Sequence, residues 1–251
     1  MKDLYDTTKK LAGYFRQTSQ QIKDKNGKVL NTNEEQLARW AEHFKELLNR
    51  PPPDVTPTIN RADEELKINL NLPSKTETKQ AIKKLKRAKA AGPYSIPPEA
   101  LKANPDLRAN ILHKICSDIW KNEVMPQDWN IGHLIKLPKK GNLKECKNYR
   151  GIALLSVVVK VLNRILLTRL LKAVDEKLRE QQAGFRKDRS CTDQIAELRI
   201  IIEQSLEWNF SLFLNFVDFE KAFDSLDRVV LWNLMAHWNT TKLHQHHQEL
   251  L

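Results

Sequence analysis

Cysteine is scarce in this sequence of 251 residues, and its spacing excludes two common kinds of small scaffold. The three cysteines, Cys116, Cys146 and Cys191, are odd in number and form no Cys-x-x-Cys pair. Neither a disulfide framework nor a zinc knuckle is therefore indicated. This pattern of cysteine use is typical of proteins that work in a reducing compartment.

The sequence also lacks a long apolar run and an export signal. Its most apolar segment, residues 152–162, is interrupted by Ser156 and Lys160 and is too short to cross a bilayer. The first residues, Met1 to Asp6, are polar and do not have the pattern of a signal peptide. We expect an intracellular protein, cytoplasmic or nuclear, that is not secreted and has no membrane partner.

Positive charge is in excess. The sequence has 42 Lys and Arg against 31 Asp and Glu, which gives a net charge of +11 and a pI of about 9.5. Such an excess favours a polyanionic partner, and nucleic acid is the simplest one. A soluble basic protein without such a partner has the same composition, so charge alone leaves both interpretations open.

Capping boxes, Thr32 with Glu35 and Ser74 with Glu77, predict the start of two helices. The second helix is expected to continue until the Gly92-Pro93 pair stops it. Apolar residues at helical spacing predict the inward face of each helix. These residues are Leu37, Trp40, Phe44, Leu47 and Leu48 in the first helix, and Ala81, Ile82 and Leu85 in the second.

Similar spacing predicts the remaining regular elements. A strand over 131–137, a basic loop and a returning strand together predict a small antiparallel sheet. Ser156 is expected to cap a helix, and Asp224 the helix over 229–237. Other helices are expected over 98–103, 106–122 (with Leu107, Ile111, Ile115 and Ile119 inward) and 192–208.

Residues 213–217 have the pattern of a buried strand that ends on the carboxylate of Asp218. Apolar side chains on both faces predict a strand that is covered on both sides. A carboxylate at the end of such a strand is held rigidly and is open to a cleft, which suits a ligand for Mg²⁺. The alternative is that Asp218 caps the helix that follows.

The stretch Asp218-Phe219-Glu220-Lys221-Ala222-Phe223-Asp224-Ser225 resembles the first catalytic motif of the reverse transcriptases of non-LTR retrotransposons. Two upstream blocks agree with this resemblance and occur in the family's order. One block is Leu137-Pro138-Lys139-Lys140-Gly141 followed by Asn148-Tyr149-Arg150-Gly151-Ile152, and the other is Glu180-Gln181-Gln182-Ala183-Gly184-Phe185-Arg186. The likeness covers about residues 74–238.

The resemblance implies RNA-directed DNA synthesis, with an RNA template, a DNA primer, deoxynucleotide triphosphates and Mg²⁺. It implies that Asp218 is catalytic and binds the metal together with the carbonyl of Phe219, which would also contact the nucleotide. It further implies that Phe223 excludes the 2′-hydroxyl of a ribonucleotide, whereas core packing is the alternative role of that ring.

The upstream blocks carry the other implied sites. Lys139 and Arg150 match the positions that hold the triphosphate, and a solvated basic loop is the alternative interpretation of this segment. Gly184 and Arg186 match a block that lies beside the template strand. A turn glycine and a surface arginine are the alternative interpretation of that pair.

The resemblance also implies an architecture of the α+β class: mostly helical polymerase fingers with a small antiparallel sheet, plus the first strand and helix of the palm. The predicted segments are a helical region at 1–50 that resembles the endonuclease–polymerase connector, a Pro-containing linker at 51–73, the fingers at 74–210, the start of the palm at 211–238 and a divergent tail at 239–251.

Two adjacent aspartates, which supply the remaining metal ligands in relatives, do not occur in this sequence. We therefore expect a truncated domain whose one carboxylate binds Mg²⁺ weakly and which alone does not extend a primer. A non-catalytic remnant that binds RNA through its basic fingers is a second hypothesis. A decayed copy that folds poorly is a third.

Overall fold

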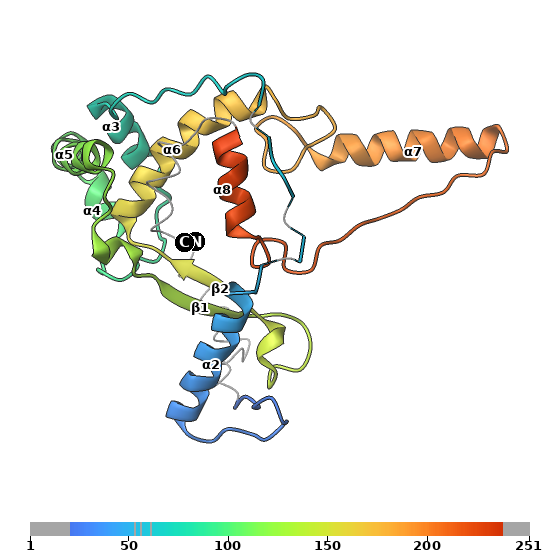
Figure 1. Cartoon of the computed structure of the whole chain (residues 1–251), viewed down its shortest axis with the longest axis horizontal. Coiled ribbons are helices and arrows are strands. Elements are labelled where there is room, and N and C mark those ends of the chain that lie inside the picture. Colours follow the sequence, from blue (N-terminus) through green and yellow to red (C-terminus); the bar gives the residue numbers. More distant parts are fainter. Residues whose placement is uncertain (1–20, 53, 56, 61, 238–251) are drawn as a thin grey trace, which may run out of the picture. The chain divides into compact units, whose positions relative to one another are not determined.

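A computed structural model describes residues 21–52, 54–55, 57–60 and 62–237, so the predicted tail at 239–251 lies outside the described residues (Figure 1). The chain divides into two compact units, Met1–Pro51 with Leu134–Ala153 and Pro52–His133 with Leu154–Leu251. The described residues form seven α-helices and one two-stranded sheet, which confirms the α+β class. None of these helices is long and apolar enough to cross a membrane.

The first unit packs one helix, α2 (Asn33–Leu48), against strands β1 (His133–Pro138) and β2 (Tyr149–Leu154). The capping box of Thr32 and Glu35 is formed as predicted. Trp40, Phe44 and Leu47 are buried, whereas Leu37 and Leu48 are exposed. The inward stripe is therefore narrower than predicted, because a two-stranded sheet covers only part of the helix surface. A short 3-10 helix, η2 (Cys146–Asn148), leads into β2.

Gly151 in β2 makes the close approach of α2 possible. A Cβ atom on this residue would lie 2.7 Å from Cε1 of Phe44 and 3.2 Å from a methyl carbon of Leu134. Real Cβ atoms do not approach a ring that closely, so only glycine fits here. The Trp40 ring also meets Tyr149 edge-on, with centroids 4.9 Å apart.

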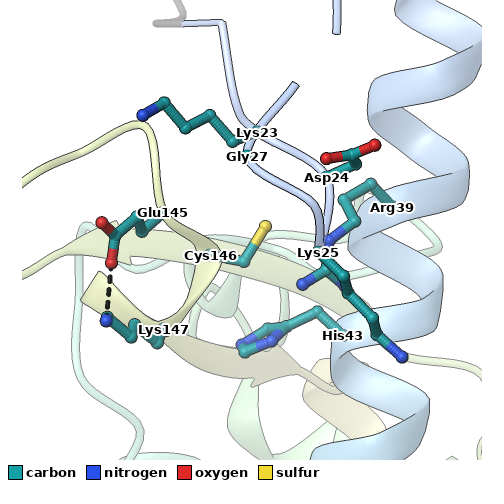
Figure 2. A pocket seen from close by; sticks show the side chains of 9 residues that line it. All are labelled: Lys23, Asp24, Lys25, Gly27, Arg39, His43, Glu145, Cys146 and Lys147. Carbon is teal, nitrogen blue, oxygen red and sulfur yellow. Dashed lines mark ion pairs between the residues drawn. The ribbon is translucent and has the colours of Figure 1, made fainter. Parts of the chain in front are cut away.

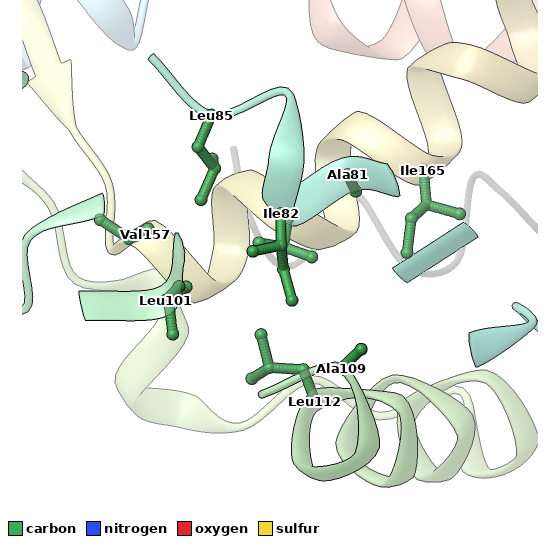
Figure 3. Close-up of a cluster of buried hydrophobic side chains, with 9 residues drawn as sticks. Ala81, Ile82, Leu85, Leu101, Ala109, Leu112, Val157 and Ile165 are labelled. Atoms are coloured by element: carbon green, nitrogen blue, oxygen red, sulfur yellow. The ribbon is translucent and has the colours of Figure 1, made fainter. Parts of the chain in front are cut away.

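The second unit is helical, and its core lies where α3, α5 and α6 meet (Figures 1 and 3). Its elements are α3 (Lys75–Lys83), α4 (Pro98–Lys102), α5 (Pro105–Asn122), the 3-10 helix η1 (Gln127–Asn130), α6 (Val157–Asp175), α7 (Cys191–Glu207) and α8 (Arg228–His237). Ser156 caps α6 as predicted, since its hydroxyl accepts from the backbone N–H of Val159. The main cluster comprises Ala81, Ile82, Leu85, Leu101, Ala109, Leu112, Val157, Val161 and Ile165.

Helix α3 ends at Lys83, so the prediction that it reaches Gly92 is wrong. The backbone turns because α4 supplies competing hydrogen bonds to it: Lys102 donates to the carbonyl of Leu85, and Glu99 accepts from the N–H of Ala88. Ala88 adopts a positive φ of 53°, which ends the helical path. The lysines and arginine of residues 86–89 therefore lie on a loop.

The predicted inward face of α5 is confirmed only in part: Ile119 is buried and Ile115 packs against the core, but the other two predicted residues are not buried. Leu107 and Ile111 are about half exposed, at 51% and 47%. The buried residues are Ala109, Leu112, Cys116, Ile119 and Trp120. Small Ala109 lies in one buried cluster with Ala81 and Ile82 of α3, so the face of α5 that carries Ala109 is the one packed against α3.

The strand predicted for residues 213–217 is not formed, and this part of the fold prediction is wrong. Phe213 and Phe216 are 92% and 77% exposed. A strand requires hydrogen bonds from a neighbour, and the described strands pair only with each other. Helix α8 starts close to its predicted position. However, Asp227 rather than Asp224 accepts from its first turn, through the N–H of Val230 at 2.8 Å.

Candidate nucleotide and nucleic-acid site

The register of the β1–β2 hairpin places Lys139 and Arg150 on one face. The N–H of Lys139 donates to the carbonyl of Asn148 at 2.7 Å, which extends the ladder past the end of β1. In that register Leu137 lies opposite Arg150, and Ile135 lies opposite Ile152. Directly opposed residues and alternate residues of antiparallel strands share a face.

The other face of the hairpin is the one that packs on α2. Lys136 lies over the Trp40 ring, with Nζ 4.6 Å from its centroid, and Gly151 abuts Phe44. The face with Lys139 and Arg150 is therefore turned away from α2. We call it the open face, made of Ile135, Leu137, Lys139, Arg150 and Ile152, all of them exposed.

The loop that joins the two strands is held by its own side chains. Asn148 donates through Nδ2 to the carbonyl of Asn142 at 2.8 Å, and the Tyr149 hydroxyl donates to the carbonyl of Leu143 at 3.0 Å. Gly141 has a φ of 114°, which side chains rarely adopt. Local bonds thus fix the loop that precedes Arg150.

A mixed-charge cavity of about 440 Å³ lies on the side of this loop that faces the turn at residues 24–28 (Figure 2). Lys147, one of its lining residues, is paired with Glu145 at 2.7 Å. The thiol of Cys146 also lines it, and burial raises the pKa of that thiol, which disfavours the reactive thiolate. Paired charges and a protonated thiol give this cavity no clear ligand preference.

Asp218 is exposed and lies in an extended segment that turns at residues 220–225. Within the part of the chain that the structure describes, no group of three His, Cys, Asp or Glu side chains could hold a metal ion. Mg²⁺ requires several oxygen ligands, so a lone carboxylate does not fit a complete site. The metal roles predicted for Asp218 and Phe219 stay predictions.

The structure brings the block around Gly184 into contact with residues 218–225, the stretch that resembles a catalytic motif. The rings of Phe185 and Phe223 meet edge-on, with centroids 5.9 Å apart and planes at 90°. Phe223 is 80% exposed, so the core-packing alternative does not describe it. Gly184 has open space around it, since a Cβ atom there would meet nothing within 4 Å.

Arg186 makes hydrogen bonds within its own turn. Its guanidinium pairs with Asp175, with Nε 2.7 Å from Oδ1, and its Nη1 donates to the carbonyls of Arg179 and Gln182. The side chain is 7% exposed, and the pairing raises the pKa of Arg186. The predicted contact with template phosphate would have to compete with these bonds.

Each unit holds part of the predicted set of site residues. The first unit contains Lys139 and Arg150, and the second contains the remaining five. Those five are Gly184, Arg186, Asp218, Phe219 and Phe223. These two units are defined by packing alone, so the predicted division into connector, linker, fingers, palm and tail stays a prediction.

The comparisons with known proteins point in one direction. The family model described as reverse transcriptase (RNA-dependent DNA polymerase) matches residues 137–249. Over 219 residues the chain is 28% identical to the probable RNA-directed DNA polymerase from transposon BS of Drosophila melanogaster, covering 84% of this chain and 24% of that protein. It is also 26% identical over 151 residues to the RNA-directed DNA polymerase from mobile element jockey of the same organism, covering 59% and 16%.

A third similar protein is the Pol polyprotein from the type-2 retrotransposable element R2DM of Drosophila melanogaster, 25% identical over 167 residues. The alignment covers 66% of this chain and 15% of that protein. The chain therefore spans a quarter or less of the length of these three relatives. The family match begins at Leu137, on the open face of the hairpin.

Proposed function

This chain carries reverse transcriptase sequence of the kind found in the RNA-directed DNA polymerases of non-LTR retrotransposons, and we propose that its hairpin β1–β2 holds the incoming deoxynucleotide triphosphate. The reaction would be template-directed addition of that nucleotide to a DNA primer on an RNA template. An intracellular site of action, cytoplasmic or nuclear, belongs to the same proposal.

The observation that carries the proposal is the placement of Lys139 and Arg150 beside an exposed apolar strip on one face. An arginine presents a planar fork of donors that matches phosphate oxygens, whereas a lysine presents a point charge. Ile135, Leu137 and Ile152 offer the apolar surface that a nucleobase covers. One face thus carries groups for both ends of a nucleotide.

The other site residues would act on the same substrate. Reverse transcriptases generally use divalent metals, which stabilise the charge of transferring phosphoryl groups. Asp218 and the carbonyl of Phe219 would be this chain's contribution to such a site. Phe223, whose ring is exposed, would exclude the 2′-hydroxyl that distinguishes ribonucleotides from deoxynucleotides.

Titration of the whole chain with a fluorescent deoxynucleotide triphosphate tests the proposal. We expect Arg150→Gln to weaken binding about tenfold or more, since each hydrogen bond to a charged group contributes about 1.5–3 kcal/mol. Arg108→Gln, which removes an exposed arginine on α5, is the matched control. Equal binding by the wild type and Arg150→Gln would refute the proposed role of the hairpin.

A second candidate function is RNA binding without catalysis, which the excess of positive charge and the lone carboxylate Asp218 favour. It predicts RNA binding that weakens with salt and survives Asp218→Ala, because phosphate contacts release counterions. Primer extension that depends on Mg²⁺ and disappears in Asp218→Ala would instead establish polymerase activity of the chain. Absence of RNA binding at low salt would exclude the second candidate.

A further inference from the structure

A cavity of about 550 Å³ in the second unit involves none of the site residues assigned above. It lies beside α6 and the loop that follows α3, and its size is in the range of small-molecule sites. Four basic side chains line it: Lys86, Lys89, Lys160 and Arg164. The rest of the lining is the amide of Asn163 and the apolar residues Leu85, Ala90, Pro98, Leu154 and Leu167.

The charges around this cavity have one sign. Lys86 and Lys89 come from the loop, Lys160 and Arg164 from α6, and no carboxylate lines the cavity. Within the described part of the chain, none of these four side chains forms a salt bridge. Like charges that converge without a counter-charge repel one another, and an anion between them would relieve that repulsion. The cavity therefore favours a negatively charged occupant.

The surface between the charges is apolar. Leu85 and Pro98 are buried, and Leu154 and Leu167 line the same space. Asn163 is the uncharged polar side chain of the lining, and its Oδ1 is buried without a hydrogen-bond partner among the described residues. A side-chain amide presents a donor and an acceptor together, which matches the edge of a nucleobase.

The loop side of the cavity is held in place. Lys102 donates to the carbonyl of Leu85 at 2.7 Å, and the N–H of Ala88 donates to Glu99 at 2.6 Å. Gly92, with a φ of 79°, approaches Leu155 so closely that a Cβ atom would lie 2.5 Å from its carbonyl oxygen. A preorganised loop loses little entropy when a ligand binds.

We propose that this cavity binds one unpaired nucleotide of single-stranded RNA, with its phosphates on the basic side chains and its base on the apolar surface. A base in a duplex is stacked and paired, whereas an unpaired base can enter a pocket. The inference deepens the proposed function and rests on it for the choice of RNA as the strand.

Photo-crosslinking tests this site with the full chain and a single-stranded RNA oligonucleotide that contains thiouridine, in the absence of Mg²⁺ and nucleotides. The expected crosslinks lie in α6 or in residues 85–90. We expect Leu167→Glu to abolish them while the circular dichroism spectrum stays unchanged. Crosslinks confined to other parts of the chain would overturn the proposal, and so would crosslinks of equal yield with the same sequence as a duplex.

Salt dependence provides a second measurement. Loss of one phosphate contact should reduce the slope of log affinity against log salt by about 0.7 for a single strand. We expect that change in Arg164→Gln but not in Lys172→Gln, which removes an exposed cation from the same helix outside the cavity. Equal slopes in both variants would contradict the assignment.

The two proposals fail separately. Arg150→Gln tests the hairpin through deoxynucleotide binding, and we expect it to leave the crosslinks in α6 intact. Leu167→Glu tests the cavity, and we expect it to leave deoxynucleotide binding intact. If the wild type shows only one of the two results, deoxynucleotide binding or RNA crosslinks in α6, the missing result identifies the proposal that is wrong.

Discussion

Arg169 on α6 and Glu77 on α3 form a two-point ion pair, with Nε 2.7 Å from Oε1 and Nη2 2.9 Å from Oε2. The same guanidinium donates through Nη1 to the carbonyls of Asn69 and Asn71, at 2.9 and 2.6 Å. Glu77 is also the third residue of α3 and closes its capping box with Ser74. One buried arginine thus joins two helices and the segment that precedes α3.

Removal of the Arg169 side chain should destabilise the second unit. Arg169→Leu removes the guanidinium from half-buried Glu77 and from the carbonyls of residues 69, 71 and 72, and leaving such acceptors unsatisfied costs about 1–3 kcal/mol. Urea unfolding measures this loss. Lys172→Leu, an exposed position on the same helix, is the control, and an equal effect of the two substitutions would show that the ion pair contributes nothing.

The same pair predicts a dependence of stability on pH. Hydrogen bonds from Arg169 lower the pKa of Glu77 from 4.5 to about 2. A carboxyl group whose pKa is lower in the folded state stabilises the fold above its unfolded pKa, and this contribution is lost as pH falls. We expect stability to decline between pH 4.5 and about 2, and to decline less in Glu77→Gln. Identical acid-unfolding curves for both proteins would contradict this expectation.

Gly151→Ala should destabilise the first unit. The added methyl group would overlap the Phe44 ring, and such overpacking costs about 1–3 kcal/mol. Amide hydrogen exchange in α2 measures the effect on this unit, and Phe44→Leu in the same chain should restore part of the stability. Gly184→Ala is the matched control, since its methyl group meets no atom.

Arg186→Gln should loosen the turn at residues 175–186. The guanidinium holds Asp175 and the carbonyls of Arg179 and Gln182, so we expect faster amide hydrogen exchange in that turn. Arg189→Gln, at an exposed position nearby, should leave the exchange unchanged. A lower salt slope of RNA binding in Arg186→Gln without faster exchange would show that Arg186 contacts phosphate instead.

The sequence predicted most helices well because capping residues and helical spacing involve residues that are close along the chain. The capping boxes at Thr32 and Ser74 are formed, and α7 begins and ends within one residue of its predicted bounds. The strand at 213–217 was mispredicted because a strand depends on a partner that its own residues do not specify. The end of α3 was mispredicted because the bonds to Ala88 and Leu85 come from α4.

The candidate site was predictable only in part. The resemblance located Lys139 and Arg150, but their shared face follows from the hairpin register, which sequence alone does not fix. Arg169 was missed because it lies within an apolar helix and its partner Glu77 is 92 residues away along the chain. The basic cavity was missed because Lys86 and Arg164 come together only through tertiary packing.

Photo-affinity labelling with an azido derivative of dATP tests the central claim most directly, because it maps the residues that contact the nucleotide. The account predicts labelling on the open face, within residues 135–152, and its loss in the Lys139→Gln, Arg150→Gln double variant. Labelling that lies elsewhere in the chain, or that persists undiminished in the double variant, would contradict it.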